Sequence, residues 1–71
     1  MSNSFKESAI ILNIHYTELN KVNDAIYFTK RLRQNKTKSE NECNEELVRL
    51  YEQKRNIENH IAECLKVLKV V

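Results

Sequence analysis

The sequence predicts an all-α protein, an antiparallel hairpin of two helices with coiled-coil-like packing. Three observations lead to this prediction. The 71 residues include no glycine and no proline, and β-hairpins, tight turns and phosphate-binding loops depend on these residue types. Apolar residues recur at heptad spacing in both halves of the chain. One short polar segment near the middle interrupts the pattern, so residues 1–71 are expected to form a single helical hairpin.

The first helix is expected at about residues 5–35. Its start fits a capping box, in which the Ser4 hydroxyl accepts from the Glu7 amide while the Glu7 side chain reaches back. An apolar seam is expected to run along this helix in alternating steps of four and three residues. The expected seam consists of Phe5, Ala9, Leu12, Tyr16, Leu19, Asn23, Ile26 and Lys30.

The turn is expected at about residues 36–39. Basic residues crowd before it and acidic residues follow it, and both arrangements complement the helix dipoles. Because the chain has no glycine, Asn35 is expected to take the left-handed conformation that ends the first helix. A second capping-box pattern, from Ser39 to Glu42, marks the start of the next helix.

The second helix is expected at about residues 40–70, and its seam is the strongest signal in the sequence. Eight of the nine seam positions are apolar, and Lys54 is the exception. The expected seam consists of Cys43, Leu47, Leu50, Lys54, Ile57, Ile61, Cys64, Leu68 and Val71. Two helices of nearly equal length joined by a short connection are expected to pack antiparallel.

Two cysteines and two histidines could carry chemistry, and neither pair forms a motif. Cys43 and Cys64 lie about 31 Å apart along one helix, too far for a disulfide, and are expected to pack as small apolar residues. His15 and His60 have no partner at metal-ligand spacing, so polar or interface-edge roles are expected, with a pH-sensitive contact as the alternative. We therefore expect a non-enzymatic protein with no catalytic residue, cofactor or metal.

The segment Lys30–Lys38 contains five basic residues and could contact phosphate. It ends one helix and faces the acidic start of the next, so a solvated turn is favoured over nucleic-acid binding or an acidic protein partner. The chain has no apolar stretch of membrane-spanning length, and its first residues lack a signal-peptide pattern. A cytoplasmic protein with reduced thiols is expected.

Apolar residues outside both seams indicate a binding partner. A helix that is apolar on most sides is expected to be buried on most sides, and one partner helix cannot achieve this. The missing partner is either a second copy of the chain or a larger helical protein. The candidate partner-binding residues are Ile14, Tyr27, Phe28, Leu32, Ile61, Leu65 and Leu68.

The matched helices around residues 35–39 and the run Ile-Glu-Asn-His-Ile-Ala at 57–62 resemble a known family. These are the small two-helix co-chaperones of bacterial type III secretion systems, the YscE/PscE/EscE-like group, and the resemblance covers the whole chain. It implies a cytosolic hairpin that binds a helical-repeat chaperone, the two together keeping the needle subunit unpolymerised. Members often have glycine in the turn, which this chain lacks.

Other interpretations remain open at this point. Seven residues of the second helix also resemble the smallest subunit of the actin-regulating WAVE complex, although that subunit's tryptophan-bearing N-terminal pattern has no counterpart here. These residues are Cys43, Leu47, Leu50, Glu52, Ile57, Glu58 and Ile61. The alternatives to a co-chaperone are a structural coiled-coil subunit of a multi-protein assembly and a small nucleic-acid-binding helical dimer. Only the Lys30–Lys38 segment favours the last of these.

Overall fold

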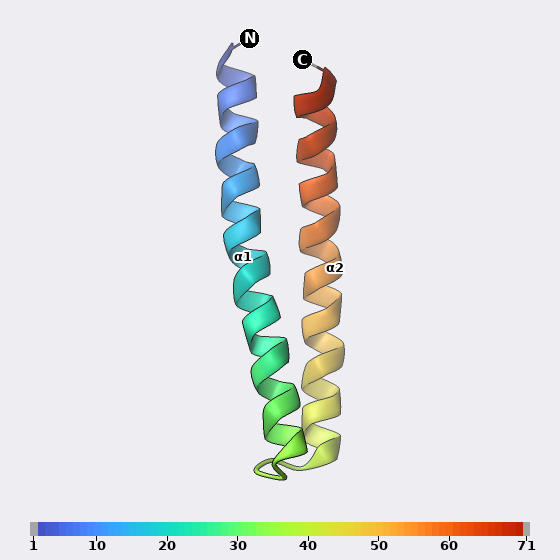
Figure 1. The fold of residues 1–71 in the computed structure, drawn as a ribbon. Helices are drawn as coiled ribbons and strands as arrows, with labels where there is room; N and C mark the ends of the chain where they lie inside the picture. Colours follow the sequence, from blue (N-terminus) through green and yellow to red (C-terminus); the bar gives the residue numbers. More distant parts are fainter. Residues whose placement is uncertain (1, 71) are drawn as a thin grey trace.

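The computed structural model describes the backbone of residues 2–70 and the side chains of residues 6–68. Helix α1 (Ser2–Gln34) and helix α2 (Glu40–Val70) pack antiparallel, with both chain ends at the same end of the molecule (Figure 1). This confirms the predicted all-α hairpin. The molecule is a rod of 53 × 14 × 12 Å with a radius of gyration of 16.0 Å, whereas a compact domain of this length has about 11 Å. Among the described residues, neither helix is both long and apolar enough to cross a lipid bilayer.

Helix α1 begins earlier than expected. It starts at Ser2, so Ser4 lies within the helix and the prediction that it caps the helix was wrong. The first residues include several polar side chains able to cap a helix, and the capping-box pattern does not distinguish among them.

The turn contains the features of a Schellman motif. The Thr37 amide donates to the Leu32 carbonyl at 3.0 Å, and the Lys36 amide donates to the Arg33 carbonyl at 3.2 Å. Lys36 has a φ of 57° and is the only described non-glycine residue with positive φ. The prediction that Asn35 takes this conformation was therefore wrong by one residue. These two hydrogen bonds place the left-handed residue one position beyond Asn35.

The seam predicted for α2 is confirmed over the described residues. Its fully buried members are Cys43, Leu47, Ile57 and Ile61, of which Cys43 has no exposed surface. Leu50, Lys54, Cys64 and Leu68 are half-buried, and Val71 lies outside the described residues. Lys54 can keep its aliphatic stem against the seam while its ammonium reaches water.

The seam predicted for α1 was wrong at three of the seven positions whose side chains are described, and the side chain of Phe5 lies outside the described residues. Tyr16, Asn23 and Lys30 are exposed, and the interhelical positions are taken instead by the residues immediately before them. These are His15, Val22 and Thr29, which alternate with Leu12, Leu19 and Ile26 at heptad spacing. Both sets flank the leucine and isoleucine positions, one on each side. The flank of α1 against which α2 packs decides which of the two sets is buried. The periodicity of α1 alone does not indicate which flank that is.

Candidate protein-binding face

Most of the large exposed apolar residues lie on two sides of the hairpin. Ile11, Ala25 and Leu32 share one heptad position, which lies beside the side of the seam formed by His15, Val22 and Thr29. Ile14 and Phe28 share the next position, farther from the seam, and Ile10 adjoins these two residues. We call these six residues the aliphatic face. Its most exposed members are Ile10 at 60%, Ile14 at 52% and Phe28 at 62%. This extent of exposed apolar surface is typical of a binding site.

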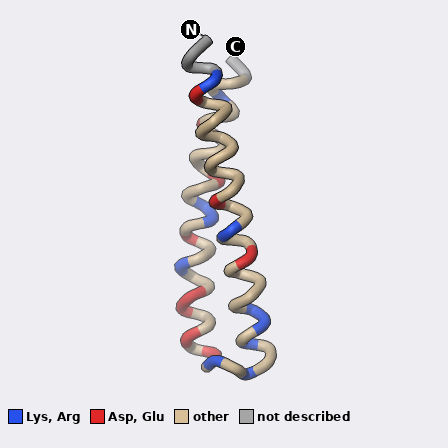
Figure 2. The backbone as a smooth tube through the Cα atoms, turned by 90° about the vertical axis from the view of Figure 1, so that its left-hand side faces the viewer, with Lys and Arg blue, Asp and Glu red and all other residues tan. Residues whose placement is uncertain are grey.

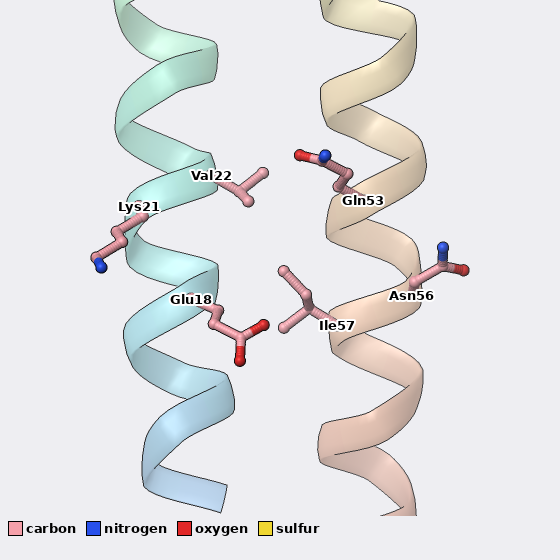
Figure 3. A pocket seen from close by; sticks show the side chains of 6 residues that line it. All are labelled: Glu18, Lys21, Val22, Gln53, Asn56 and Ile57. Carbon is pink, nitrogen blue, oxygen red and sulfur yellow. The ribbon is translucent and has the colours of Figure 1, made fainter.

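A shallow groove of about 400 Å³ lies in the middle of the aliphatic face. It is lined by Glu18, Lys21 and Val22 of α1 and by Gln53, Asn56 and Ile57 of α2 (Figure 3). Glu18 and Lys21 occupy the same heptad positions as the apolar residues on either side of them. The face therefore consists of two apolar patches separated by a polar groove, an arrangement that can fix the register of a docked helix.

The opposite side of the hairpin, which we call the tyrosine face, has polar contacts of its own. Its members are Tyr16, Tyr27, Val48, Tyr51 and Leu65. The Lys30 ammonium lies 5.7 Å from the Tyr51 ring centroid, and the Arg31 guanidinium lies 5.9 Å from the Tyr27 ring centroid. Arg31 Nη1 also donates to the Tyr27 hydroxyl at 3.3 Å. The Lys30 ammonium can donate a hydrogen bond to the phenolate, which lowers the pKa of Tyr51.

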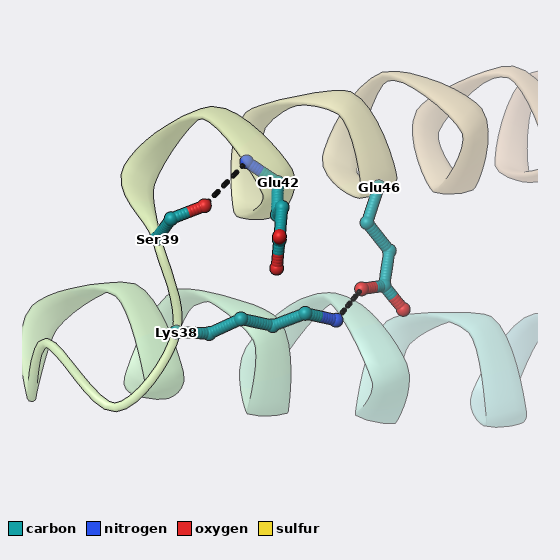
Figure 4. A network of polar contacts seen from close by, with 4 residues as sticks. All are labelled: Lys38, Ser39, Glu42 and Glu46. Carbon is teal, nitrogen blue, oxygen red and sulfur yellow. Dashed lines mark hydrogen bonds and ion pairs between the residues drawn. The ribbon is translucent and has the colours of Figure 1, made fainter.

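Basic and acidic residues meet at the turn (Figure 2). Arg33 Nη1 donates to Asn44 Oδ1 at 2.7 Å, and Lys38 Nζ donates to Glu46 Oε2 at 3.1 Å (Figure 4). The hydrogen bond to Glu46, with the attraction of its charge, raises the pKa of Lys38. The Ser39 hydroxyl accepts from the Glu42 amide at 3.2 Å, which confirms Ser39 as the N-cap of α2.

The basic segment Lys30–Lys38 thus makes contacts within the chain. Lys30 and Arg31 lie against tyrosine rings, Arg33 binds Asn44, and Lys38 binds Glu46. These contacts occupy four of its five basic side chains. They support the interpretation of the segment as a turn that matches the helix dipoles.

The structure does not gather the seven candidate partner-binding residues into one patch. Ile14, Phe28 and Leu32 belong to the aliphatic face, whereas Tyr27 and Leu65 belong to the tyrosine face. Ile61 is buried in the seam with 7% exposure, and Leu68 is half-buried in the same seam. Sequence reasoning left Ile10 and Ile11 out of the candidates, although their heptad positions adjoin that of Ile14.

The packing brings the two histidines together. The rings of His15 and His60 have centroids 5.2 Å apart and planes tilted by 49°. Cys43 is buried and Cys64 half-buried, and both are free thiols. Among the described residues, no group of three or more histidine, cysteine, aspartate or glutamate side chains is positioned to hold a metal ion.

The comparisons with known proteins identify no relative. No family model matches the chain, and no curated protein or solved structure is significantly similar to it.

Proposed function

We propose that this chain is a non-enzymatic protein-interaction module that docks its aliphatic face onto a larger helical partner. The observation that carries the proposal is surface area. The chain exposes 5740 Å², whereas a compact monomer of 8.5 kDa exposes about 4,650 Å². The excess of about 1,100 Å² is larger than the roughly 800 Å² that each partner buries in a standard interface.

The chemistry of the two faces favours the aliphatic face as the docking surface. Tyrosine hydroxyls tolerate water, and on the tyrosine face Tyr27 and Tyr51 already contact basic side chains. Isoleucine side chains have no polar end, so their exposure is offset only by burial against another apolar surface. A partner helix with apolar residues at matching spacing would cover Ile14 and Phe28 and cross the polar groove between them.

The specific form of this proposal is a cytoplasmic co-chaperone of a type III secretion needle subunit, with a helical-repeat chaperone as its partner. The two-helix architecture and the resemblance at residues 57–62 support it. Within that run, Ile57 and Ile61 are buried between the helices, so the part of the resemblance that they carry concerns hairpin packing. The two free thiols agree with a reducing compartment.

The main alternative is a structural coiled-coil subunit, in which the same face would meet further helices of an assembly. Sedimentation equilibrium of the purified chain separates the two. A co-chaperone without its partner is expected to be a weakly stable monomer with a shallow melting transition. A sharply melting dimer or tetramer would instead favour the structural subunit.

Photo-crosslinking tests the docking face directly. A benzophenone amino acid at position 28 should crosslink the full chain to a larger protein in cells, whereas the same group at position 27 should not. These neighbouring positions are almost equally exposed, at 62% and 64%, and lie about 100° apart around the helix. Equal crosslinking from both positions, or crosslinks only to a second copy of the chain, would contradict the proposal.

A pair of substitutions then tests the energetics. Phe28→Asp should dissociate the purified complex because it places a charge in the apolar contact, whereas Tyr27→Asp should leave the complex intact. Circular dichroism of the isolated chain should be the same for both variants, since neither side chain is in the seam. If Phe28→Asp removes helical signal while Tyr27→Asp does not, Phe28 stabilises the hairpin itself and the assignment of the face fails.

A further inference from the structure

We propose that His15 and His60 bind a divalent transition-metal ion of the zinc class between the two helices. The imidazoles belong to opposite helices, and their ring centroids are 5.2 Å apart. Imidazole nitrogen is a common ligand of Zn²⁺, Cu²⁺ and Ni²⁺. The proposal rests on the contact between the two rings and not on the docking proposed above, although Glu18, which lies beside His15, also lines the groove of the aliphatic face.

The spacing of the two rings fits a shared ion. Zinc binds an imidazole nitrogen at about 2.0–2.1 Å, which places the ion about 3.2 Å from the ring centroid. Two imidazoles on a tetrahedral ion then have centroids about 5.2 Å apart. The observed separation has this value, so the two helices hold the rings at the spacing that a shared ion needs.

The environment of His15 adds a second, independent observation. Its Nδ1 atom is shielded from solvent and has no hydrogen-bond partner among the described residues. A buried polar atom is rarely left in this way in folded proteins. In the tautomer that carries its proton on Nε2, this nitrogen has a lone pair that it can give to a metal ion.

A carboxylate lies within reach of the same atom. Glu18 Oε1 is 3.9 Å from His15 Nδ1, one helical turn along α1. A change of side-chain rotamer would bring Glu18 to the ion as a third ligand, and water would complete the coordination. His60 is exposed and leaves the site open to solvent.

Binding of Zn²⁺ to the full chain tests the proposal. Isothermal titration should show saturable binding of one ion per chain, and Co²⁺ should give the visible absorption bands of a nitrogen-ligated site. Because zinc would bind only the packed hairpin, the melting temperature should rise with zinc concentration. His60→Gln should weaken binding by at least about tenfold and abolish the rise, with little effect on the metal-free fold, since His60 is exposed.

Two control variants separate this site from its neighbours. Glu63→Gln removes a metal-ligating type of side chain one turn from His60 and should leave zinc binding unchanged. Cys64→Ser should also leave it unchanged; equal loss in this variant would identify a thiol site and overturn the proposal. Absence of saturable binding, a stoichiometry of one ion per two chains, or undiminished binding by His60→Gln would each overturn it as well.

Discussion

The half of the hairpin near the turn and the half near the chain ends are packed differently. Near the turn, both helices supply fully buried side chains: Ile26 and Thr29 from α1, and Cys43 and Leu47 from α2. Near the chain ends, α2 still supplies Ile57 and Ile61, but no α1 side chain described before residue 26 is fully buried. The α1 sequence in that half places its isoleucines outside the seam.

The tighter internal packing thus lies near the turn, and the exposed isoleucines lie near the chain ends. Near the turn, three polar contacts reach from α1 and the turn to α2. They join Arg33 to Asn44, Lys38 to Glu46, and Lys30 to the Tyr51 ring. In the other half, the seam of α1 includes Ser8 and His15, while Ile10, Ile11 and Ile14 remain exposed. Apolar residues that could have strengthened the internal packing therefore remain exposed.

The largest expected effect comes from truncating the core near the turn. Leu47→Ala should lower the free energy of unfolding by about 2–4 kcal/mol, because Leu47 is 6% exposed and the substitution leaves a cavity. Leu12→Ala, at a half-buried seam position near the chain ends, should cost about 1 kcal/mol. Urea unfolding followed by circular dichroism measures both. Equal losses would show that the two halves contribute alike.

A smaller, stabilising effect is expected in the turn. Lys36→Gly should raise the free energy of unfolding by about 1 kcal/mol, because glycine takes the observed positive φ without the steric cost that lysine has. Asn35→Gly is the matched control and should not stabilise, since Asn35 does not have positive φ. If the control stabilises and Lys36→Gly does not, the left-handed residue is Asn35, as the sequence alone had predicted.

The smallest expected effect is the pH dependence of the Lys38–Glu46 ion pair. The fold raises the pKa of Lys38 above its ordinary value of 10.5. The contribution of the protonated lysine is therefore fully present below pH 10.5 and is lost as the pH rises through the raised pKa. Thermal melts should show a slight loss for Glu46→Gln at pH 8 that disappears at high pH. Both side chains are exposed, so added salt should also reduce the difference.

The candidate partner-binding residues, including the neighbours Tyr27 and Phe28, show how much of the candidate face the sequence could predict. Ile14 and Phe28, two of the candidates drawn from the surplus apolar content, are exposed and lie on one face. The same argument grouped Tyr27 with Phe28, although the two belong to different faces, and included Ile61, which the seam buries. Composition shows that apolar residues are in excess, but three-dimensional packing determines which of them share a surface.

The sequence by itself determined the two helices, the position of the turn, the Ser39 cap and the α2 seam, because these depend on interactions over a few residues and on a strong heptad pattern. Only the tertiary structure decided which flank of α1 faces α2. That choice buries Thr29, half-buries Val22, exposes Tyr16, and places His15 against His60, 45 residues away in the chain. Local periodicity cannot contain such information, since it arises from the contact between the helices.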